Sequence, residues 1–220
     1  TYGYRKSTVL VSLLNACILL VAVGVILVES VRKLYDPQPV DGDSIAWVAG
    51  VGIVINAFTA WLFMKDRKRD LNVKGAFLHM AADALVSLGV VVSGIVISAT
   101  GWYVIDPIIG LVIAAVILVS TTHLLFDSLR LSLDGVPDGI RVDELERMMT
   151  AVPGVEAVHH IHVWAISTTE NALTAHVVLT DLSRLEAVKR ELKTRLDGAG
   201  VHHATLEFES VAENCCDFSD

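Results

Sequence analysis

A histidine and an aspartate stand four residues apart inside a long apolar stretch of the chain, as His79 and Asp83. At 3.6 residues per turn, a helix would place both side chains on one face, one turn apart. Neutral imidazole and ionised carboxylate are two ligand types that zinc accepts, and two ligands on one helix leave two corners of a tetrahedron for another helix. The pair therefore indicates half of a transition-metal site.

The aspartate of this pair is costly where it stands. A carboxylate near the centre of a membrane-spanning helix costs roughly 2.5–3.5 kcal/mol on insertion scales, so it needs a partner or a water-filled cavity. A second interpretation is that His79 hydrogen-bonds Asp83 and joins two helices. The spacing alone does not separate the two interpretations. The following stretch, ALVSLGVVVSGIVIS, has serine and glycine at short intervals, which permits close helix approach and favours a shared site.

A second concentration of metal-ligand residues lies in the last third of the chain. Six of the eight histidines fall within residues 159–203, in VHHIHVW, TAHVVL and HHATLEFE, which read as strands. Because a strand alternates its faces, we expect His160 and His162 on one side and His159 on the other. Histidines of neighbouring strands lie about 5 Å apart and could converge on one ion. The alternative is a surface histidine cluster with no resident metal.

Other candidate ligands stand near the end of the chain. Glu209 is seven residues beyond His202 and could complete a set of three histidines and one glutamate. Cys215 and Cys216 are adjacent, which makes them poor disulfide partners and lacks the spacing of a CxxC knuckle. They either bind a second ion or bind nothing. Their presence favours a reducing compartment.

The composition indicates a membrane protein with an acidic soluble part. Of 220 residues, 53% are hydrophobic, more than in an ordinary soluble domain. Residues 1–131 hold ten basic and nine acidic side chains, whereas residues 132–220 hold seven and sixteen. The strongly acidic part argues against nucleic acid as a partner and favours cations.

Residues 1–131 are predicted to form a transmembrane domain. A bilayer core takes roughly 20 apolar residues as a helix. The start TYGYRK and the connector KDRKRDLNVK are both basic and two spans apart, so the positive-inside rule places them, and everything from residue 126 onward, in the cytoplasm. Four segments qualify as spans, at about residues 9–31, 45–64, 76–99 and 104–125.

Residues 132–220 are predicted to form a small α+β domain. Its helices show apolar residues at helical spacing, and its strands are rich in β-branched and aromatic residues. The order α-β-β-α-β predicts a compact sheet with helices packed on it. The predicted elements are a helix at 141–152, strands at 155–166 and 171–179, a helix at 184–196 and a strand at 203–211.

Taken in order, these features resemble the cation diffusion facilitator family, in particular its bacterial zinc-type members. The resemblance rests on TYGYRK leading into LVSLLNA, on HMAAD, on WYVIDPIIGLVIA, and on VHHIHVW, TAHVVL, HHATLEFES and the closing NCC. It covers essentially the whole chain. It implies a bundle of six spans with both ends in the cytoplasm, a metallochaperone-like tail domain and a homodimer. The four spans present here correspond to the last four, so the first two, with two further transport ligands, are expected to be missing.

The resemblance also implies roles for individual residues. His79 and Asp83 correspond to half of the transport site. Lys6 and Asp134 resemble a charged pair that locks the cytoplasmic ends of two helices between subunits. The tail-domain metal site would use His159, His176, His202 and Glu209, with His160, His162, Cys215 and Cys216 as further candidate ligands.

The expected function is efflux of a divalent metal ion in exchange for protons, across the cell (inner) membrane. Zn²⁺ suits the ligands best, although Cd²⁺, Co²⁺ and Ni²⁺ would also bind such a set. The alternative is a membrane-anchored metal-sensing or metal-storage protein without transport. An ion channel is less favoured, because channels need rings of weakly binding ligands. We expect no enzymatic activity.

Overall fold

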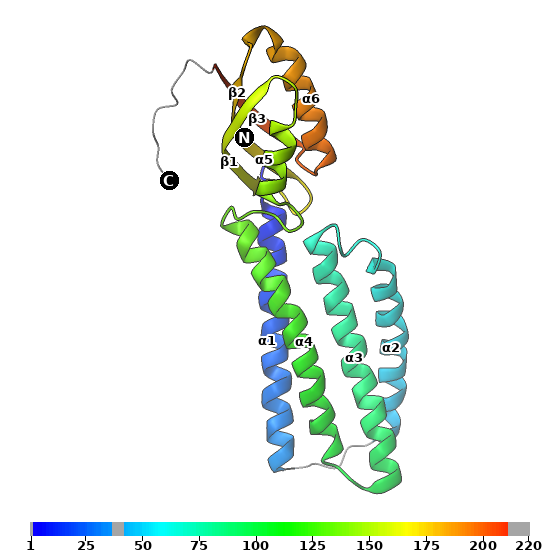
Figure 1. The fold of residues 1–220 in the computed structure, drawn as a ribbon. Coiled ribbons are helices and arrows are strands. Elements are labelled where there is room, and N and C mark those ends of the chain that lie inside the picture. Colours follow the sequence, from blue (N-terminus) through cyan, green and yellow to red (C-terminus); the bar gives the residue numbers. More distant parts are fainter. Residues whose placement is uncertain (1, 37–41, 211–220) are drawn as a thin grey trace. The chain divides into compact units, whose positions relative to one another are not determined.

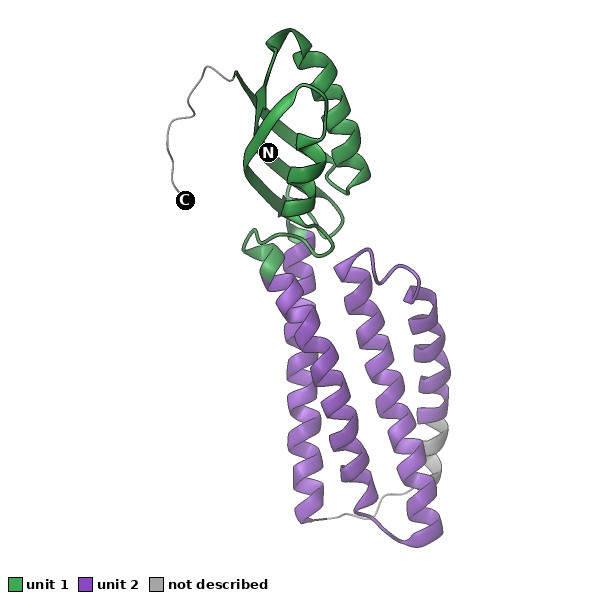
Figure 2. Ribbon diagram, in the orientation of Figure 1, with its two compact units in different colours: residues 1–7, 130–220 green, residues 8–129 purple. Residues whose placement is uncertain are grey.

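The structure is a computed structural model that describes residues 2–36 and 42–210, with the side chains of residues 2–36 and 49–210. Contacts divide the chain into two compact units, residues 8–129 and residues 1–7 with 130–220 (Figure 2). Residues 8–129, purple in Figure 2 and called the first unit below, contain most of four long helices (Figure 1), and residues 1–7 with 130–220, green in Figure 2, are called the second unit. The four helices are α1 (Ser7–Tyr35), α2 (Gly42–Phe63), α3 (Leu71–Thr100) and α4 (Ile105–Ser132).

Three of these helices are long and apolar enough to cross a membrane. α1, α3 and α4 have 29, 30 and 28 residues, and at 1.5 Å per residue each exceeds a hydrocarbon core of about 30 Å. α2 has 22 residues, but only Ala49–Phe63 of it has described side chains and reads as a shorter apolar helix. Large apolar side chains lie exposed on the bundle, as a lipid-facing surface requires: Val21, Val54, Ile95 and Phe126.

The helix α3 has clear start and stop signals. The Asp70 side chain accepts a hydrogen bond from the backbone N–H of Asn72 at 2.8 Å, which caps the first turn. At the other end, Gly101 adopts the left-handed conformation with φ 68°. Its N–H donates to the carbonyl of Ile97, which gives one carbonyl of the last turn a hydrogen-bond partner. These two signals fix the segment that carries His79 and Asp83.

Small residues bring the helices of the bundle close together. A Cβ atom on Gly89 of α3 would lie 2.5 Å from Ile113 of α4, and one on Gly110 of α4 would lie 2.4 Å from the Ser30 hydroxyl of α1. The buried hydroxyls of Ser12 and Ser128 join α1 to α4 at 2.9 Å. Close approach at small residues is a common way of packing membrane helices. The serine and glycine pattern after Asp83 therefore has the packing role expected of it.

We predict that Gly89→Val destabilises the bundle while Gly94→Val does not. The new side chain at position 89 would overlap Ile113 and Ile109, and overpacking of this kind costs about 1–3 kcal/mol. Gly94 lies on the same helix with nothing within 4 Å of an added Cβ, so it controls for the helix propensity of valine. Thermal unfolding of the two variants in detergent is the measurement. Equal melting temperatures would contradict the packing role of Gly89.

The second unit is a three-stranded sheet with two α-helices. Its strands β1 (Val155–Ala165) and β2 (Asn171–Leu179) are antiparallel, and β3 (His203–Ser210) lies parallel to β2. A parallel neighbour requires a crossover connection, supplied by the 3₁₀ turn η1 (Leu182–Arg184) and α6 (Leu185–Gly198). The remaining helix, α5 (Val142–Thr150), precedes β1. The predicted order α-β-β-α-β is confirmed.

The core of this unit lies between the sheet and its two helices. Alternate residues of β2, from Leu173 to Leu179, are buried against apolar side chains of α5 and α6. The residues between them, including His176, belong to the opposite face. The helical side of the core consists of Leu145 and Met149 of α5 and Val188, Leu192 and Leu196 of α6.

Two exposed carboxylates help to define the helix starts of this unit. The hydroxyl and backbone N–H of Ser183 donate to Asp181 before α6 and hold the pKa of that carboxyl below its usual range. Hydrogen bonding from Arg141 likewise lowers the pKa of Asp143 in the first turn of α5. Because folding lowers both pKa values, the two carboxylates stabilise the folded state at neutral pH. This stabilisation is lost as the pH falls through the folded-state pKa values.

Candidate metal centres

The predicted pair on α3 has the geometry of two ligands of one ion. The Nε2 atom of His79 lies 3.6 Å from Oδ2 of Asp83. Two atoms bound to zinc at 2.0–2.2 Å and at tetrahedral angles are about 3.3–3.6 Å apart. A separation of 3.6 Å is too long for a hydrogen bond, so the geometry favours a shared ion over a simple hydrogen-bonded link. The side chains are 44% and 46% exposed, which leaves room for further ligands.

Contacts on both sides of the pair fix its helix within the bundle. One turn before His79, the Lys74 ammonium group forms an ion pair with Asp127 of α4 at 2.6 Å. Beside Asp83, Ala82 is buried in a cluster that also contains Val23 of α1. The ligand pair is therefore carried by a helix that packs against both α1 and α4.

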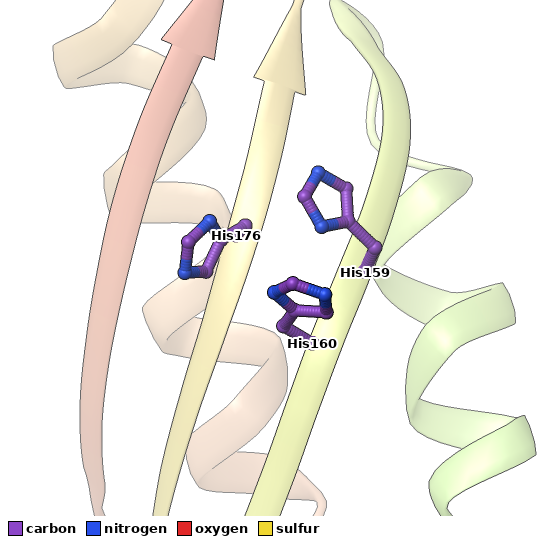
Figure 3. Close-up of side chains that lie close together, drawn as sticks. All are labelled: His159, His160 and His176. Atoms are coloured by element: carbon purple, nitrogen blue, oxygen red, sulfur yellow. The ribbon is translucent and has the colours of Figure 1, made fainter. Parts of the chain in front are cut away.

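Three histidines gather on the sheet of the second unit. His159 of β1 lies directly opposite His176 of β2 in the antiparallel register, and their ring centroids are 5.2 Å apart. The ring of His160 is 5.0 Å from that of His159 and 5.2 Å from that of His176. One ligand atom from each ring can be chosen so that all lie within 4.8 Å of one another. Figure 3 shows the three side chains grouped over β1 and β2.

The expected alternation of faces along β1 is wrong at this point. His159 pairs with His176 and His162 pairs with Thr174, so three steps on β1 match two on β2. This is a β-bulge, and His160 within it has φ 48°, in the left-handed region. The extra residue allows His159 and His160, although adjacent, to approach the same partner ring.

Two carboxylates complete this cluster from β3. Glu209 is only 8% exposed; its carboxylate lies 2.5 Å from Nδ1 of His176 and 3.3 Å from Nε2 of His159. Glu207 lies directly beside His176 in the parallel register, and its Oε2 is 3.6 Å from Nε2 of that ring. The separations of 3.3 and 3.6 Å fit two ligands of one zinc ion, whereas the 2.5 Å contact between Glu209 and Nδ1 of His176 is that of a hydrogen bond. The contact to Glu209 also orients the ring of His176, as carboxylates do for metal-binding histidines.

Glu207 is a candidate ligand that the sequence interpretation missed. Glu207 and Glu209 are two residues apart in LEFES, so on a strand they share one face. This spacing could have identified Glu207 as a candidate ligand beside Glu209 from the sequence alone.

The structure does not bring every predicted ligand to this cluster. His203 lies opposite Ala172, four residues along β2 from His176, a distance of roughly 13 Å. His202 is therefore far from the cluster within one chain, and its Nδ1 instead lies 2.9 Å from Asp197. His162 is exposed beyond the bulge. Cys215 and Cys216 lie outside the described residues.

The predicted charged pair forms within one chain. Lys6, just before α1, makes an ion pair with Asp134, just after α4. Asp134 has φ 58°, and the N–H of the next residue donates to the carbonyl of Arg130, which ends the helix. Nearby, Arg5 pairs with Glu170 at 2.5 Å. Residues 2–6 are thus fastened to the second unit by side-chain contacts.

Comparison with known families covers nearly all of the described chain. Residues 1–131 match the model of the cation efflux transmembrane domain, and residues 137–210 match that of the cation efflux protein cytoplasmic domain. The chain belongs to the cation diffusion facilitator family. Its members are cation efflux transporters, and the helical bundle and the α/β unit described above are the two parts of this transporter fold.

Similar transporters occur in several bacteria. The cadmium, cobalt and zinc/H(+)-K(+) antiporter of Bacillus subtilis is 30% identical over 219 residues, which cover 97% of this chain and 70% of that protein. The efflux protein CzcD of Cupriavidus metallidurans is 35% identical over 95% of this chain and 67% of its own length. The zinc transporter ZitB of Escherichia coli is 32% identical over the same shares.

A protein of known structure is also similar in sequence to part of this chain. The metal-bound C-terminal domain of CzcD from Cupriavidus metallidurans is 36% identical, with a TM-score of 0.29 over 32% of this chain and 99% of that domain.

Proposed function

We propose that the protein is a carrier that exports divalent metal ions from the cytoplasm in exchange for protons, with Zn²⁺ as its main substrate. The observation that carries this proposal is the His79–Asp83 pair, whose ligand atoms lie 3.6 Å apart on a helix long enough to span a membrane. Family membership favours transport over an anchored metal sensor or store. We propose no enzymatic reaction for either metal centre.

The ligand types couple the metal to protons. Zinc binds neutral imidazole and ionised carboxylate, so protons and metal compete for the same atoms of His79 and Asp83. A more acidic exterior favours the protonated pair and hence metal release. The cytoplasm favours the deprotonated pair and metal loading. Rocking of helices around a site in the middle of the membrane would expose the pair to each side in turn.

The donor set favours zinc without excluding similar ions. Imidazole and carboxylate also suit Co²⁺ and Ni²⁺, and a half-exposed site can adapt to the larger Cd²⁺. The relative in Bacillus subtilis is named for cadmium, cobalt and zinc, which is consistent with a site of this breadth.

We place the second unit in the cytoplasm and propose that it responds to zinc as part of a homodimer in the cell (inner) membrane. Residues 132–220 carry nine more acidic than basic side chains, so two copies repel each other when no metal is bound. Zinc held by His159, His160 and His176, with the carboxylates of Glu207 and Glu209, would reduce that repulsion. The Lys6–Asp134 pair would transmit a change in this unit to the start of α1.

Inverted membrane vesicles test the exchange directly. In vesicles that contain the protein expressed from its complete gene, zinc uptake should require an acidic interior and should release protons outward. Each pH unit should change the equilibrium zinc ratio by about tenfold per proton exchanged, since one unit corresponds to 1.36 kcal/mol. A protonophore should abolish accumulation. Uptake that ignores the pH gradient would contradict proton exchange.

A further inference from the structure

A single carboxylate joins three helices of the bundle at the end remote from the basic connector. Asp106 stands in the first turn of α4. Its Oδ2 accepts a hydrogen bond from the ammonium group of Lys33 in α1 at 2.9 Å. Its Oδ1 lies 2.9 Å from the hydroxyl of Ser93 in α3, which shares its proton between Asp106 and the carbonyl of Gly89 at 2.7 Å. We call these three residues the outer clamp.

The outer clamp is shielded at Ser93 and Asp106 but not at Lys33. Ser93 is 2% exposed, and the side chains of Asp106 and Lys33 are 19% and 41% exposed. Replacement of Lys33 would leave the mostly buried carboxylate of Asp106 without its compensating charge, which is unfavourable. The closed arrangement of the three helix ends therefore depends on Lys33 and Asp106 remaining together.

The outer clamp borders a cavity of about 230 Å³ between α1, α3 and α4. Its polar wall is formed by Lys33, Asp106 and Glu29, whose carboxylate lies 3.9 Å from the Lys33 ammonium group. Its apolar wall includes Val86 and Val90 of α3. A cavity of this volume with polar walls has room for several water molecules.

The cavity lies along the helix face that carries the metal ligands. His79, Asp83, Val86, Val90 and Ser93 follow one another at steps of four, three, four and three residues. Residues at these steps form one stripe along a helix. From Asp83 to Ser93 the stripe rises about 15 Å. The metal pair and the outer clamp are therefore the two ends of one continuous face of α3.

An apolar layer separates the two ends of this stripe. Val86 and Ile113 line the cavity, and both pack against buried Val23, Ala82 and Ala114. A cation that leaves Asp83 along this face would first cross the apolar layer and then enter the polar cavity. The sequence places this end of the bundle away from the cytoplasm, because it lies opposite the basic connector.

We propose that Lys33, Asp106 and Ser93 are positioning residues that close the exit side of the transport route. While the Lys33 ammonium group holds Asp106, α1, α3 and α4 stay together and passage from the cavity to the exterior is restricted. Separation of Lys33 from Asp106 opens the cavity to a hydrated divalent cation. This inference rests on the proposed transport function, but it concerns a different group of residues.

The opposite end of the bundle offers a matched ion pair for comparison. Lys74 of α3 contacts Asp127 of α4 at 2.6 Å, and the two side chains are 29% and 27% exposed. This pair also joins two helices, but it stands on the predicted cytoplasmic side. Loss of Lys74 should therefore leave access from the exterior unchanged.

Labelling of a cysteine placed in the cavity tests the proposal. Val90→Cys is introduced after replacement of Cys17, Cys215 and Cys216 by serine, and right-side-out vesicles are treated with a membrane-impermeant maleimide. Lys33→Met should raise the labelling rate by about tenfold, within the usual range of coupling effects. Lys74→Met should leave it unchanged. Equal rates with Lys33 intact and replaced would overturn the proposal.

Two further variants keep the test decisive if Lys33→Met folds poorly. The double variant Lys33→Asp with Asp106→Lys restores an ion pair and should restore slow labelling. If each residue matters only for folding, the double variant should label as fast as Lys33→Met. Ser93→Ala removes one hydrogen bond and should raise labelling to a smaller extent. Labelling requires no zinc, so it tests the outer clamp independently of transport. If the variants change labelling as expected but the protein transports no zinc, only the proposed function is contradicted. Normal transport with labelling unaffected by all these variants would contradict the outer clamp only.

Discussion

Replacement of Asp83 with alanine is expected to abolish zinc transport. The carboxylate provides one of the two ligand atoms on α3, and it lies 3.6 Å from Nε2 of His79. Loss of an outer partner of a metal ligand typically lowers affinity or activity 10–100-fold, so loss of a ligand itself should reduce the transport rate by about 100-fold or more. Zinc flux into vesicles at a fixed pH gradient is the measurement.

The matched control removes a carboxylate that lies outside the bundle interior. Asp66 is exposed in the basic connector before α3, so Asp66→Ala should transport zinc at the normal rate. Asp83→Ala should also retain zinc binding by the second unit, because the histidine cluster belongs to other residues. Normal zinc transport by Asp83→Ala would contradict the role of this pair as the transport site, whereas an anchored metal-binding protein would show no zinc flux in the parent or in the variant.

The second large effect is expected from His176→Ala, which should reduce zinc binding by the second unit by about 100-fold or more. The His176 ring stands between the β1 histidines and the two carboxylates of β3: it is 5.2 Å from the rings of His159 and His160 and 2.5 Å from Glu209. Both three-residue groups of the cluster that could hold a metal ion include this ring. The measurement is a zinc titration of the Asp83→Ala protein, in which the metal pair of α3 is disrupted and the second unit provides the remaining candidate site.

Two other histidines provide controls for this result. His162→Ala removes an exposed imidazole from the same strand beyond the bulge, and zinc affinity should stay within about threefold of the parent, a change of less than 1 kcal/mol. His202→Ala tests the role that family resemblance implies for this residue. If His202→Ala weakens binding as much as His176→Ala does, a partner copy must supply the imidazole, because His202 is remote from the cluster within one chain.

Local patterns were sufficient to predict most elements of the fold. The strand Asn171–Leu179 was predicted with its observed bounds, and from Leu173 to Leu179 its buried residues alternate with half-buried ones. The ligand spacing of His79 and Asp83 could also be read directly, since four residues on a helix always return to the same face. These features depend only on residues that are close in the sequence.

Features that depend on register or helix rotation could not be predicted in this way. His202 was assigned to the metal cluster, but the parallel pairing of β3 with β2 places it at the other end of the strand. That register depends on the packing of α6, not on the residues of β3 itself. The contact of Asp106 with Lys33 and Ser93 likewise joins residues 13 to 73 positions apart, and no local pattern marks it.

The additional residue at His160 determines which face of the sheet each later residue of β1 occupies. Val158 and Val163 are five positions apart, yet both are buried in the core, which strict alternation would forbid. Deletion of one residue at this point would either turn Val163 out of the core or turn His159 away from His176. The metal binding that we propose for this sheet and the burial of its core therefore depend on the same backbone irregularity, so a change that removes the bulge would disturb both.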